Sequence, residues 1–278
     1  MQKIQFSKMH GAGNDFIILT EKEFSTVQSI EQVQFLCHRR LGVGSDGIII
    51  IGPHDVLDFK MRFINPDGSE GMFCGNGSRC AVAKAYELGW MGKTGEFEAV
   101  DGPHKAIYHG PEDIEVQMID IQEIQSRLRG YFVQTGAPHY VEVVQDLAAV
   151  DVEQVGRAIR YDLRFAPQGT NANFIEFHQG NLRIRTYERG VEKETLACGT
   201  GITAAAISYH HQLMSEDVQL DYLVIARGGK VRITARLDDE GIYRNVMMRG
   251  PVKEVFQATI DIPEKPFDIL SDIPKIQD

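Results

Sequence analysis

The sequence predicts an α+β fold in which sheets wrap a small number of helices, built from two duplicated halves. Most of the expected elements are short segments rich in β-branched and aromatic residues, separated by turn formers. Helical patterns are few, which indicates the α+β class. In addition, the residues around Cys74 recur 124 positions later around Cys198, and this repeat indicates a duplication.

The expected strands share this composition and are bounded by Gly, Pro, Asn or Asp. In chain order they are Lys3–Lys8, Phe16–Thr20, Gly47–Ile51, Asp58–Asn65, Ile107–Tyr108, Ile114–Met118, Tyr131–Thr135, Tyr140–Val144, Asn173–Phe177, Leu182–Tyr187, Tyr222–Ile225, Lys230–Leu237 and Tyr243–Arg249.

Helices are expected at Ile30–Arg40, at Val152–Arg160 and directly after the glycine clusters that begin at Gly75 and Gly199. The two helices after the glycines are rich in alanine and other small residues. We therefore expect both to be packed on all sides.

The repeat sets the expected domain division. At one offset Cys74 falls on Cys198, Gly75 on Gly199, and Gly77 on Gly201. We expect an N-terminal lobe over residues 1–125 and a C-terminal lobe over 126–255. The strands near 255–278 are candidates to cross back to the first lobe, and the tail Glu264–Asp278 shows no clear periodicity.

Composition excludes several function classes. The net charge of −10 argues against a nucleic-acid partner. There is no apolar run long enough for a membrane span and no secretory signal, so we expect a cytoplasmic protein with free thiols. The four cysteines include no CxxC pair and no Cys/His cluster with metal spacing, so no metal site is expected.

Cys74 and Cys198 each begin a Cys-Gly-x-Gly segment between a strand and a helix. Each thiol is thus expected among the unpaired backbone N–H groups of a helix N-terminus. The field of the helix end would lower the thiol pKa from roughly 8.5 toward neutrality. The same N–H groups can bind a carboxylate, and the glycines let the backbone approach it closely.

Two such helix ends facing each other would grip one carboxylate, with a thiol on either side of the α-carbon. One thiolate could then remove the α-proton while the other thiol delivers a proton to the opposite face. The N–H donors would stabilise the carbanion charge on the carboxylate. This chemistry inverts a stereocentre and requires no imine-forming cofactor.

Five segments together resemble the signature blocks of the diaminopimelate epimerase family. They are His10–Phe16 (HGAGNDF), Asn65–Glu70 (NPDGSE), Cys74–Cys80 (CGNGSRC), Thr186–Val191 (TYERGV) and Thr195–Gly201 (TLACGTG). The resemblance implies conversion of LL- to meso-diaminopimelate, without cofactor, in lysine and peptidoglycan precursor biosynthesis. It also implies a homodimer of two-lobed subunits, each lobe a largely antiparallel sheet or open barrel around a central helix.

By this resemblance Cys74 and Cys198 are the catalytic pair. The positions that match the family's carboxylate-binding backbone are Gly75, Asn76, Gly199 and Thr200. The positions that match its distal substrate contacts are Asn14, Asn65, Asn171, Glu188 and Arg189. An arginine fork suits the distal carboxylate of a diamino-diacid, and Glu with Asn amides suits its ammonium. His139 is a candidate for assisting proton transfer or orienting substrate.

Two positions depart from the family pattern. Many members have Asn-Pro-His where this chain has Ala137-Pro-His139, so an amide is missing that water, a main-chain group or Asn173 could replace. Gly47 stands where some members have glutamine. Both changes concern substrate stringency rather than proton chemistry.

Alternative interpretations concern both function and single motifs. A proline- or hydroxyproline-type racemase would use the same pair of acid/base thiols, but proline has no distal group for Glu188 and Arg189 to bind. A non-catalytic binding protein on the same fold would not need both cysteines.

Gly42–Gly47 matches GxGxxG, but a helical stretch precedes it and a strand follows, the reverse of a dinucleotide site. Cys37 and Cys80 are interpreted as packed structural thiols.

Overall fold

The computed structural model describes residues 2–214 and 217–266. Residues 267–278, which are most of the tail predicted over Glu264–Asp278, lie outside the described residues. Strands dominate, helices are few, and the predicted α+β class is confirmed. The part of the chain that the structure describes contains no helix that is both long and apolar enough to cross a membrane.

The strands of the N-terminal half are β1 (Gln2–Gly11), β2 (Asn14–Thr20), β3 (Ile48–Gly52), β4 (Phe59–Ile64), β5 (Thr94–Ala99), β6 (Gly102–Gly110) and β7 (Asp113–Gln117). The later strands are β8 (Ile124–Arg127), β9 (Gly130–Gln134), β10 (Pro138–Val143), β11 (Asn171–His178), β12 (Asn181–Glu188), β13 (Lys193–Thr195), β14 (Gln219–Ala226), β15 (Gly229–Leu237), β16 (Tyr243–Gly250) and β17 (Lys253–Ile262). The helices are α1 (Glu21–Phe24), α2 (Ile30–Cys37), α3 (Gly75–Glu87), α4 (Val152–Arg160) and α5 (Gly199–Gln212), with a 3₁₀ turn at Leu163–Phe165.

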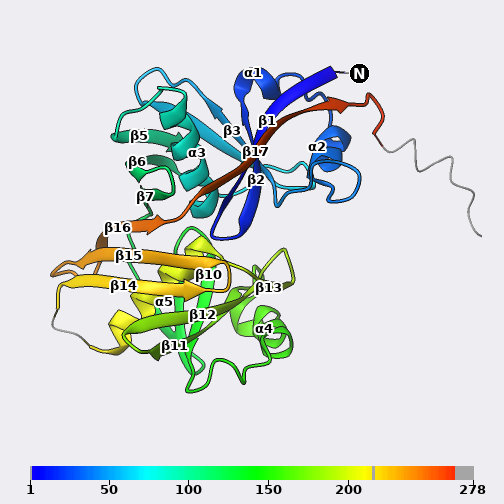
Figure 1. Ribbon diagram of the computed structural model, residues 1–278. Coiled ribbons are helices and arrows are strands. Elements are labelled where there is room, and N and C mark those ends of the chain that lie inside the picture. Colours follow the sequence, from blue (N-terminus) through cyan, green and yellow to red (C-terminus); the bar gives the residue numbers. More distant parts are fainter. Residues whose placement is uncertain (1, 215–216, 267–278) are drawn as a thin grey trace, which may run out of the picture.

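Two helices occupy the centres of two sheet systems (Figure 1). Helix α3 packs against β1, β2, β3, β4, β6 and β7, and α5 packs against β9, β10, β11, β12, β14 and β15. Both helices are lined with small buried residues, among them Ala81 and Ala85 in α3 and Ala205 in α5. Small side chains let strands approach a helix from several sides, as the alanine-rich sequence predicts.

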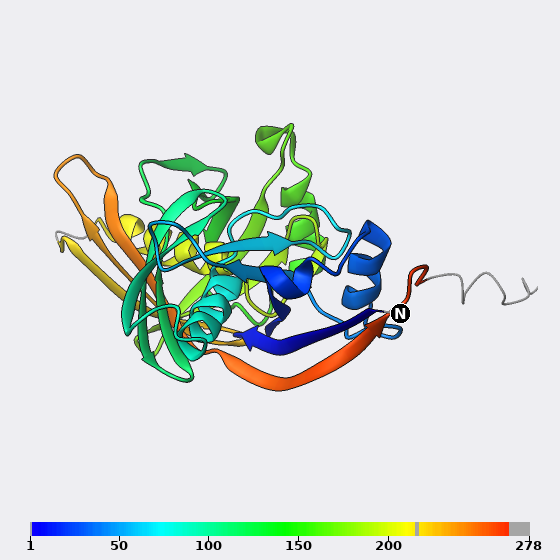
Figure 2. The ribbon, with the colours of Figure 1, turned by 90° about the horizontal axis from the view of Figure 1, so that it is seen from above.

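Most neighbouring strands pair antiparallel, and a few crossover pairs are parallel, such as β2 with β3 and β10 with β11. The two sheet systems join where β16 pairs antiparallel with β7, with Met248 opposite Val116. After β16, strand β17 runs back along β1, where Gln2 pairs with Ile262 and His10 with Lys253. Figures 1 and 2 both show β1 and β17 side by side.

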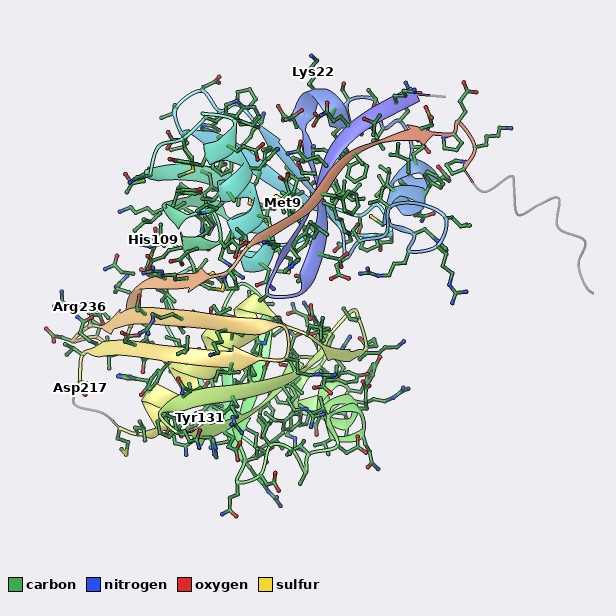
Figure 3. The ribbon with its side chains drawn as sticks, viewed as in Figure 1. Met9, Lys22, His109, Tyr131, Asp217 and Arg236 are labelled. Atoms are coloured by element: carbon green, nitrogen blue, oxygen red, sulfur yellow. The ribbon has the colours of Figure 1, made fainter. Side chains whose placement is uncertain are left out.

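We propose the same division into lobes, 1–125 and 126–255. Strand β8 lies across this boundary and pairs with β9. The buried core continues from one half to the other, because one cluster contains Met9 and Ile49 together with Ile202 and Val231. In Figure 3, Met9 is labelled in the upper half of the molecule and Tyr131 in the lower half.

The structure differs from the sequence-based prediction at several elements. The helix expected over Ile30–Arg40 ends at Cys37, because His38 adopts an extended conformation (φ −70°, ψ 120°). Gly42 then packs so closely that a Cβ there would lie 1.8 Å from the Phe35 carbonyl oxygen. Strand β5 was not predicted, because Glu96 and Glu98 are residue types depleted in strands, although they alternate with the buried Phe97 and Ala99.

Candidate active site

A cleft of ≈ 1360 Å³ lies between the N-terminal ends of α3 and α5 and is lined by residues of both halves of the chain. All of the predicted site residues except His139 line it. They are Asn14, Asn65, Cys74, Gly75, Asn76, Asn171, Glu188, Arg189, Cys198, Gly199 and Thr200. Residues that are far apart in the sequence therefore meet in one cavity.

The two cysteines occupy matching positions at the two helix ends. Cys74 and Cys198 are the N-cap residues of α3 and α5, both with extended backbone (φ −118° and −113°), and both are half-buried. The Sγ of Cys74 accepts a hydrogen bond from the Gly77 N–H at 3.4 Å. Both thiols therefore stand beside the free N–H groups of a helix N-terminus.

The helix ends approach each other closely. Asn76 Nδ2, in the first turn of α3, donates to the carbonyl of Ala197, the residue before Cys198, at 3.2 Å. Behind both ends lies Met248 of β16, whose Cε would lie 2.1 Å from a Cβ at Gly75 and 3.4 Å from one at Gly199. The lack of a side chain at Gly75 thus permits the approach, whereas a Cβ at Gly199 would make only an ordinary contact.

The thiol pKa values contradict the expectation from the helix ends. Burial raises the pKa of Cys74 to about 11, and the Gly77 N–H only partly opposes this. Burial, together with the nearby Glu188 carboxylate, raises the pKa of Cys198 still further. The predicted shift toward neutrality is therefore wrong, because loss of hydration outweighs the field of the helix end.

The residues that match the family's distal substrate contacts also line the cleft. Asn171 is held on both sides: its Oδ1 accepts from the Arg189 N–H at 2.8 Å, and its Nδ2 donates to Pro138 O at 2.8 Å. The Arg189 guanidinium donates to Gln168 O at 3.2 Å. Burial raises the pKa of the Glu188 carboxyl, which lies near both thiols.

Asn14 connects the cleft to a charged network that the sequence did not indicate. Its Nδ2 donates to Asp46 Oδ2 at 2.6 Å, and its Oδ1 accepts from Asn76 Nδ2 at 3.3 Å. Arg39 binds both Asp46 and Asp15, at 2.6 and 2.7 Å. These bonds fix the orientation of the Asn14 amide within the cleft wall.

His139 lies behind the cleft and is fully buried. Its Nδ1 lies 3.1 Å from Asn173 Nδ2, which also donates to Tyr140 O at 2.8 Å. Asn173 Oδ1 accepts from the Thr186 hydroxyl at 3.0 Å, so the orientation of the amide is fixed. His139 Nδ1 must therefore accept a hydrogen bond, and its proton is on Nε2.

Because its proton is on Nε2, His139 is the donor in the first of two hydrogen bonds that connect it to Cys198. His139 Nε2 donates to Thr200 Oγ1 at 2.8 Å, and Thr200 Oγ1 lies 3.4 Å from Cys198 Sγ. In that last contact either the Thr200 hydroxyl or the Cys198 thiol can be the donor. Because Asn173 is buried and engaged in this chain, it does not replace the amide that is missing at Ala137, which lines the cleft.

Among the described residues, no group of three or more His, Cys, Asp or Glu side chains has an arrangement that could hold a metal ion.

The roles of Asn173 and Thr186 behind the cleft were not predicted from the sequence, and neither was the burial of Arg79 in α3. One signal was present for Arg79, since it is the single charged residue in Cys74–Val82.

The family model and the relatives found by sequence comparison carry the same name. The family model described as diaminopimelate epimerase matches residues 6–121 and 131–255. Proteins named diaminopimelate epimerase from Flavobacterium psychrophilum and Aquifex aeolicus are each 37% identical to this chain. The alignments cover 91% and 92% of this chain and 98% of each relative.

Similar solved structures share the fold at low sequence identity. A phenazine biosynthesis protein of the PhzF family from Bacillus anthracis matches with a TM-score of 0.75 and 15% identity, over 94% of this chain and 100% of that one. A hydroxyproline epimerase from Agrobacterium vitis matches with a TM-score of 0.69 and 12% identity, over 95% and 94%.

Proposed function

This chain belongs to the diaminopimelate epimerase family, and from that premise we propose that it interconverts LL- and meso-diaminopimelate by two-base proton transfer at the α-carbon. Membership makes it an isomerase that acts as an amino-acid epimerase. The observation that carries the proposed mechanism is the pair of half-buried thiols, Cys74 and Cys198, at two helix ends that share one cleft.

In the proposed reaction the substrate carboxylate binds between the helix ends, at the backbone N–H groups of Gly75, Asn76, Gly199 and Thr200. One thiolate removes the α-proton, and its sulfur becomes a thiol. The opposite thiol gives its proton to the other face of the carbanion and becomes the thiolate. The N–H donors and the positive helix ends stabilise the negative charge that develops on the carboxylate.

The raised thiol pKa values support this chemistry. A desolvated thiolate is a stronger base than a hydrated one. Burial therefore reduces the difference between the pKa of the thiol and the much higher pKa of the α-proton. The α-ammonium of a bound amino acid brings a positive charge next to the sulfur. That charge favours the thiolate only when a substrate is in place.

The other polar residues that line the cleft support a substrate with a second amino-acid head group. We propose that Arg189 binds the distal carboxylate and that Glu188, Asn14, Asn65 and Asn171 receive the distal ammonium or orient these groups. Proline has no distal group, so the proline-type alternative leaves these polar residues without a ligand. We propose that the enzyme requires no cofactor and serves lysine and peptidoglycan precursor biosynthesis. A homodimeric state and a cytoplasmic location stay predictions.

The test is an epimerisation assay with purified, reduced protein on LL-diaminopimelate and, in parallel, on L-proline. We expect conversion of the first substrate only. Cys74→Ala and Cys198→Ala should each lose turnover by about 10²- to 10⁴-fold, the usual contribution of a general acid or base, while calorimetric binding is retained. Turnover of proline would favour the racemase alternative. Binding of diaminopimelate without turnover by the wild type would favour the non-catalytic one.

A further inference from the structure

Arg79 is a fully buried cation with few partners. Its side chain is 0% exposed and reaches back along α3 to the helix N-terminus, where Nη1 donates to Gly75 O at 3.3 Å and Nη2 to Asn76 Oδ1 at 3.0 Å. Its Nε has no hydrogen-bond partner among the described residues. Burial lowers the pKa of Arg79 only to about 10, so the guanidinium is charged at neutral pH.

This placement is unfavourable for a cation unless an anion lies near it. Transfer of an unpaired charge into a protein interior is strongly opposed, and a helix N-terminus is the positive end of the helix dipole. The surrounding backbone nevertheless leaves room for the guanidinium. A Cβ at Gly11 would lie 3.2 Å from Nη2, and one at Gly250 would lie 3.4 Å from the guanidinium carbon.

Two thiols interact electrostatically with the Arg79 guanidinium, that of Cys80 first and that of Cys74 second. Cys80 is fully buried on α3, and burial raises its pKa to about 12. Cys74 lines the cleft and already accepts the Gly77 N–H. From β12, Glu188 opposes a thiolate at both Cys74 and Cys198. The Gly77 N–H favours a thiolate at Cys74 most, and Arg79 adds a smaller contribution of the same sign. No cation is among the leading influences on Cys198.

The internal repeat shows that this charge belongs to one helix only. The position in α5 that corresponds to Arg79, 124 residues later, is Thr203. The Thr203 hydroxyl donates to Gly199 O at 3.1 Å, just as Arg79 Nη1 donates to Gly75 O. The two helix ends therefore share a hydrogen-bonding pattern and differ in charge.

We propose that Arg79 is a positioning residue that supplies a buried counter-charge to the Cys74 thiolate, so that Cys74 loses its proton more readily than Cys198. Cys74 gives its proton to solvent, and the guanidinium keeps all of its own. The proposal rests on the proposed function, in which Cys74 is one of the two reacting thiols.

The first test uses the wild-type protein without substrate. Alkylation by iodoacetamide requires the thiolate, and mass spectrometry reports Cys74 and Cys198 separately because they lie in different tryptic peptides. We expect the pH midpoint of alkylation at Cys74 to lie at least about one unit below that at Cys198, a tenfold difference in the thiolate equilibrium. Equal midpoints, or a lower midpoint at Cys198, would overturn the proposal.

The second test compares Arg79→Met, which removes the charge, with Arg79→Lys, which keeps it. In Arg79→Met the Cys74 midpoint should rise by about one unit or more, while the Cys198 midpoint in the same molecule stays unchanged. Arg79→Lys should restore most of the shift, and Thr203→Val, at the corresponding position of α5, should leave Cys74 unaffected. No shift in Arg79→Met, or an equal shift at both cysteines, would contradict the proposal.

Should Arg79→Met fail to fold, the wild-type comparison and Arg79→Lys decide the matter. These measurements use no substrate, so they are independent of whether diaminopimelate is turned over. A protein that fails to epimerise diaminopimelate but shows the expected alkylation profiles would refute the proposed function and leave the role of Arg79 standing.

Discussion

His139 is kept neutral by its surroundings. Burial lowers the pKa of its imidazole to about 3, and protonation of Nδ1 would also break the hydrogen bond that it accepts from Asn173. A neutral ring with its proton on Nε2 can donate to Thr200 but cannot act as an acid at physiological pH. We therefore interpret His139 as a group that orients the Thr200 hydroxyl toward Cys198 and not as a proton donor.

Thr200→Val tests this chain of hydrogen bonds. The substitution keeps the shape of the side chain but leaves the buried His139 Nε2–H without an acceptor, which should lower the free energy of unfolding by about 1–3 kcal/mol. Thr200→Ser, which keeps the hydroxyl, is the matched control and should stay close to the wild type. Urea denaturation measures both variants, and equal stability of the two would contradict the hydrogen-bond chain.

His139 also predicts how stability depends on pH. Its pKa is about 3 in the folded protein and about 6.5 in an unfolded chain, so below pH 6.5 the unfolded state binds a proton that the folded state does not. This group should therefore lower stability as pH falls from about 6.5 to 3, by about 1.4 kcal/mol per pH unit. Urea midpoints from pH 7 to 4 should fall less steeply in His139→Gln. Identical slopes in the two proteins would contradict this prediction.

At the scale of elements, the first turn of α5 is fitted to its neighbours through glycine. A Cβ at Gly201 would lie 2.6 Å from Asn173 Oδ1, and that amide is fixed by its hydrogen bonds. A Cβ at Gly199 would meet its nearest atoms in Met248 at 3.4 Å, an ordinary contact. Gly201 and Gly199 lie in the same helical turn, so the same substitution can be compared at a tightly packed and at a loosely packed glycine.

Gly201→Ala should destabilise the protein by about 1–3 kcal/mol, because the added methyl group overpacks a rigid site. Gly199→Ala should leave the thermal midpoint nearly unchanged. Calorimetry of the two variants makes the comparison. A larger loss in Gly199→Ala than in Gly201→Ala would mean that the packing at this helix end is not as described.

The predictability of each element depended on how plainly its pattern appears in the sequence. Strands with apolar faces, such as β3 (Ile48–Gly52), were predicted to within a residue. The length of α2 was wrong because its end depends on the contact between Gly42 and Phe35, which no local pattern encodes. The short strand β13 (Lys193–Thr195) was missed because it is charged and polar and is defined only by pairing with β12.

At the scale of the whole molecule, the cleft forms because the two repeated helix ends face each other. The repeat around Cys74 and Cys198 predicted that meeting, and all of the predicted site residues except His139 line one cavity. The buried environment could not be predicted, because desolvation of a thiol depends on packing from strands throughout the chain. Hence the expected pKa direction was wrong, and neither Arg79 nor the chain through Asn173 was anticipated.

The size of the cleft predicts closure on a ligand. At ≈ 1360 Å³ it exceeds the roughly 300–1,000 Å³ of typical small-molecule sites, and its lining comes from both lobes. We expect small-angle scattering to show a smaller radius of gyration when diaminopimelate saturates the protein. Cys74→Ala should compact equally, since closure depends on binding and not on proton transfer. An unchanged radius at saturation would contradict closure.

The most direct test of the central claim is proton NMR of LL-diaminopimelate with the reduced protein in D₂O, without added cofactor. Two-base transfer predicts that the meso isomer forms with solvent deuterium at the inverted α-carbon, because the proton delivered by the second thiol comes from solvent. Formation of the meso isomer with the original α-proton retained would contradict two separate bases. Absence of both exchange and inversion in folded protein would contradict the proposed activity itself.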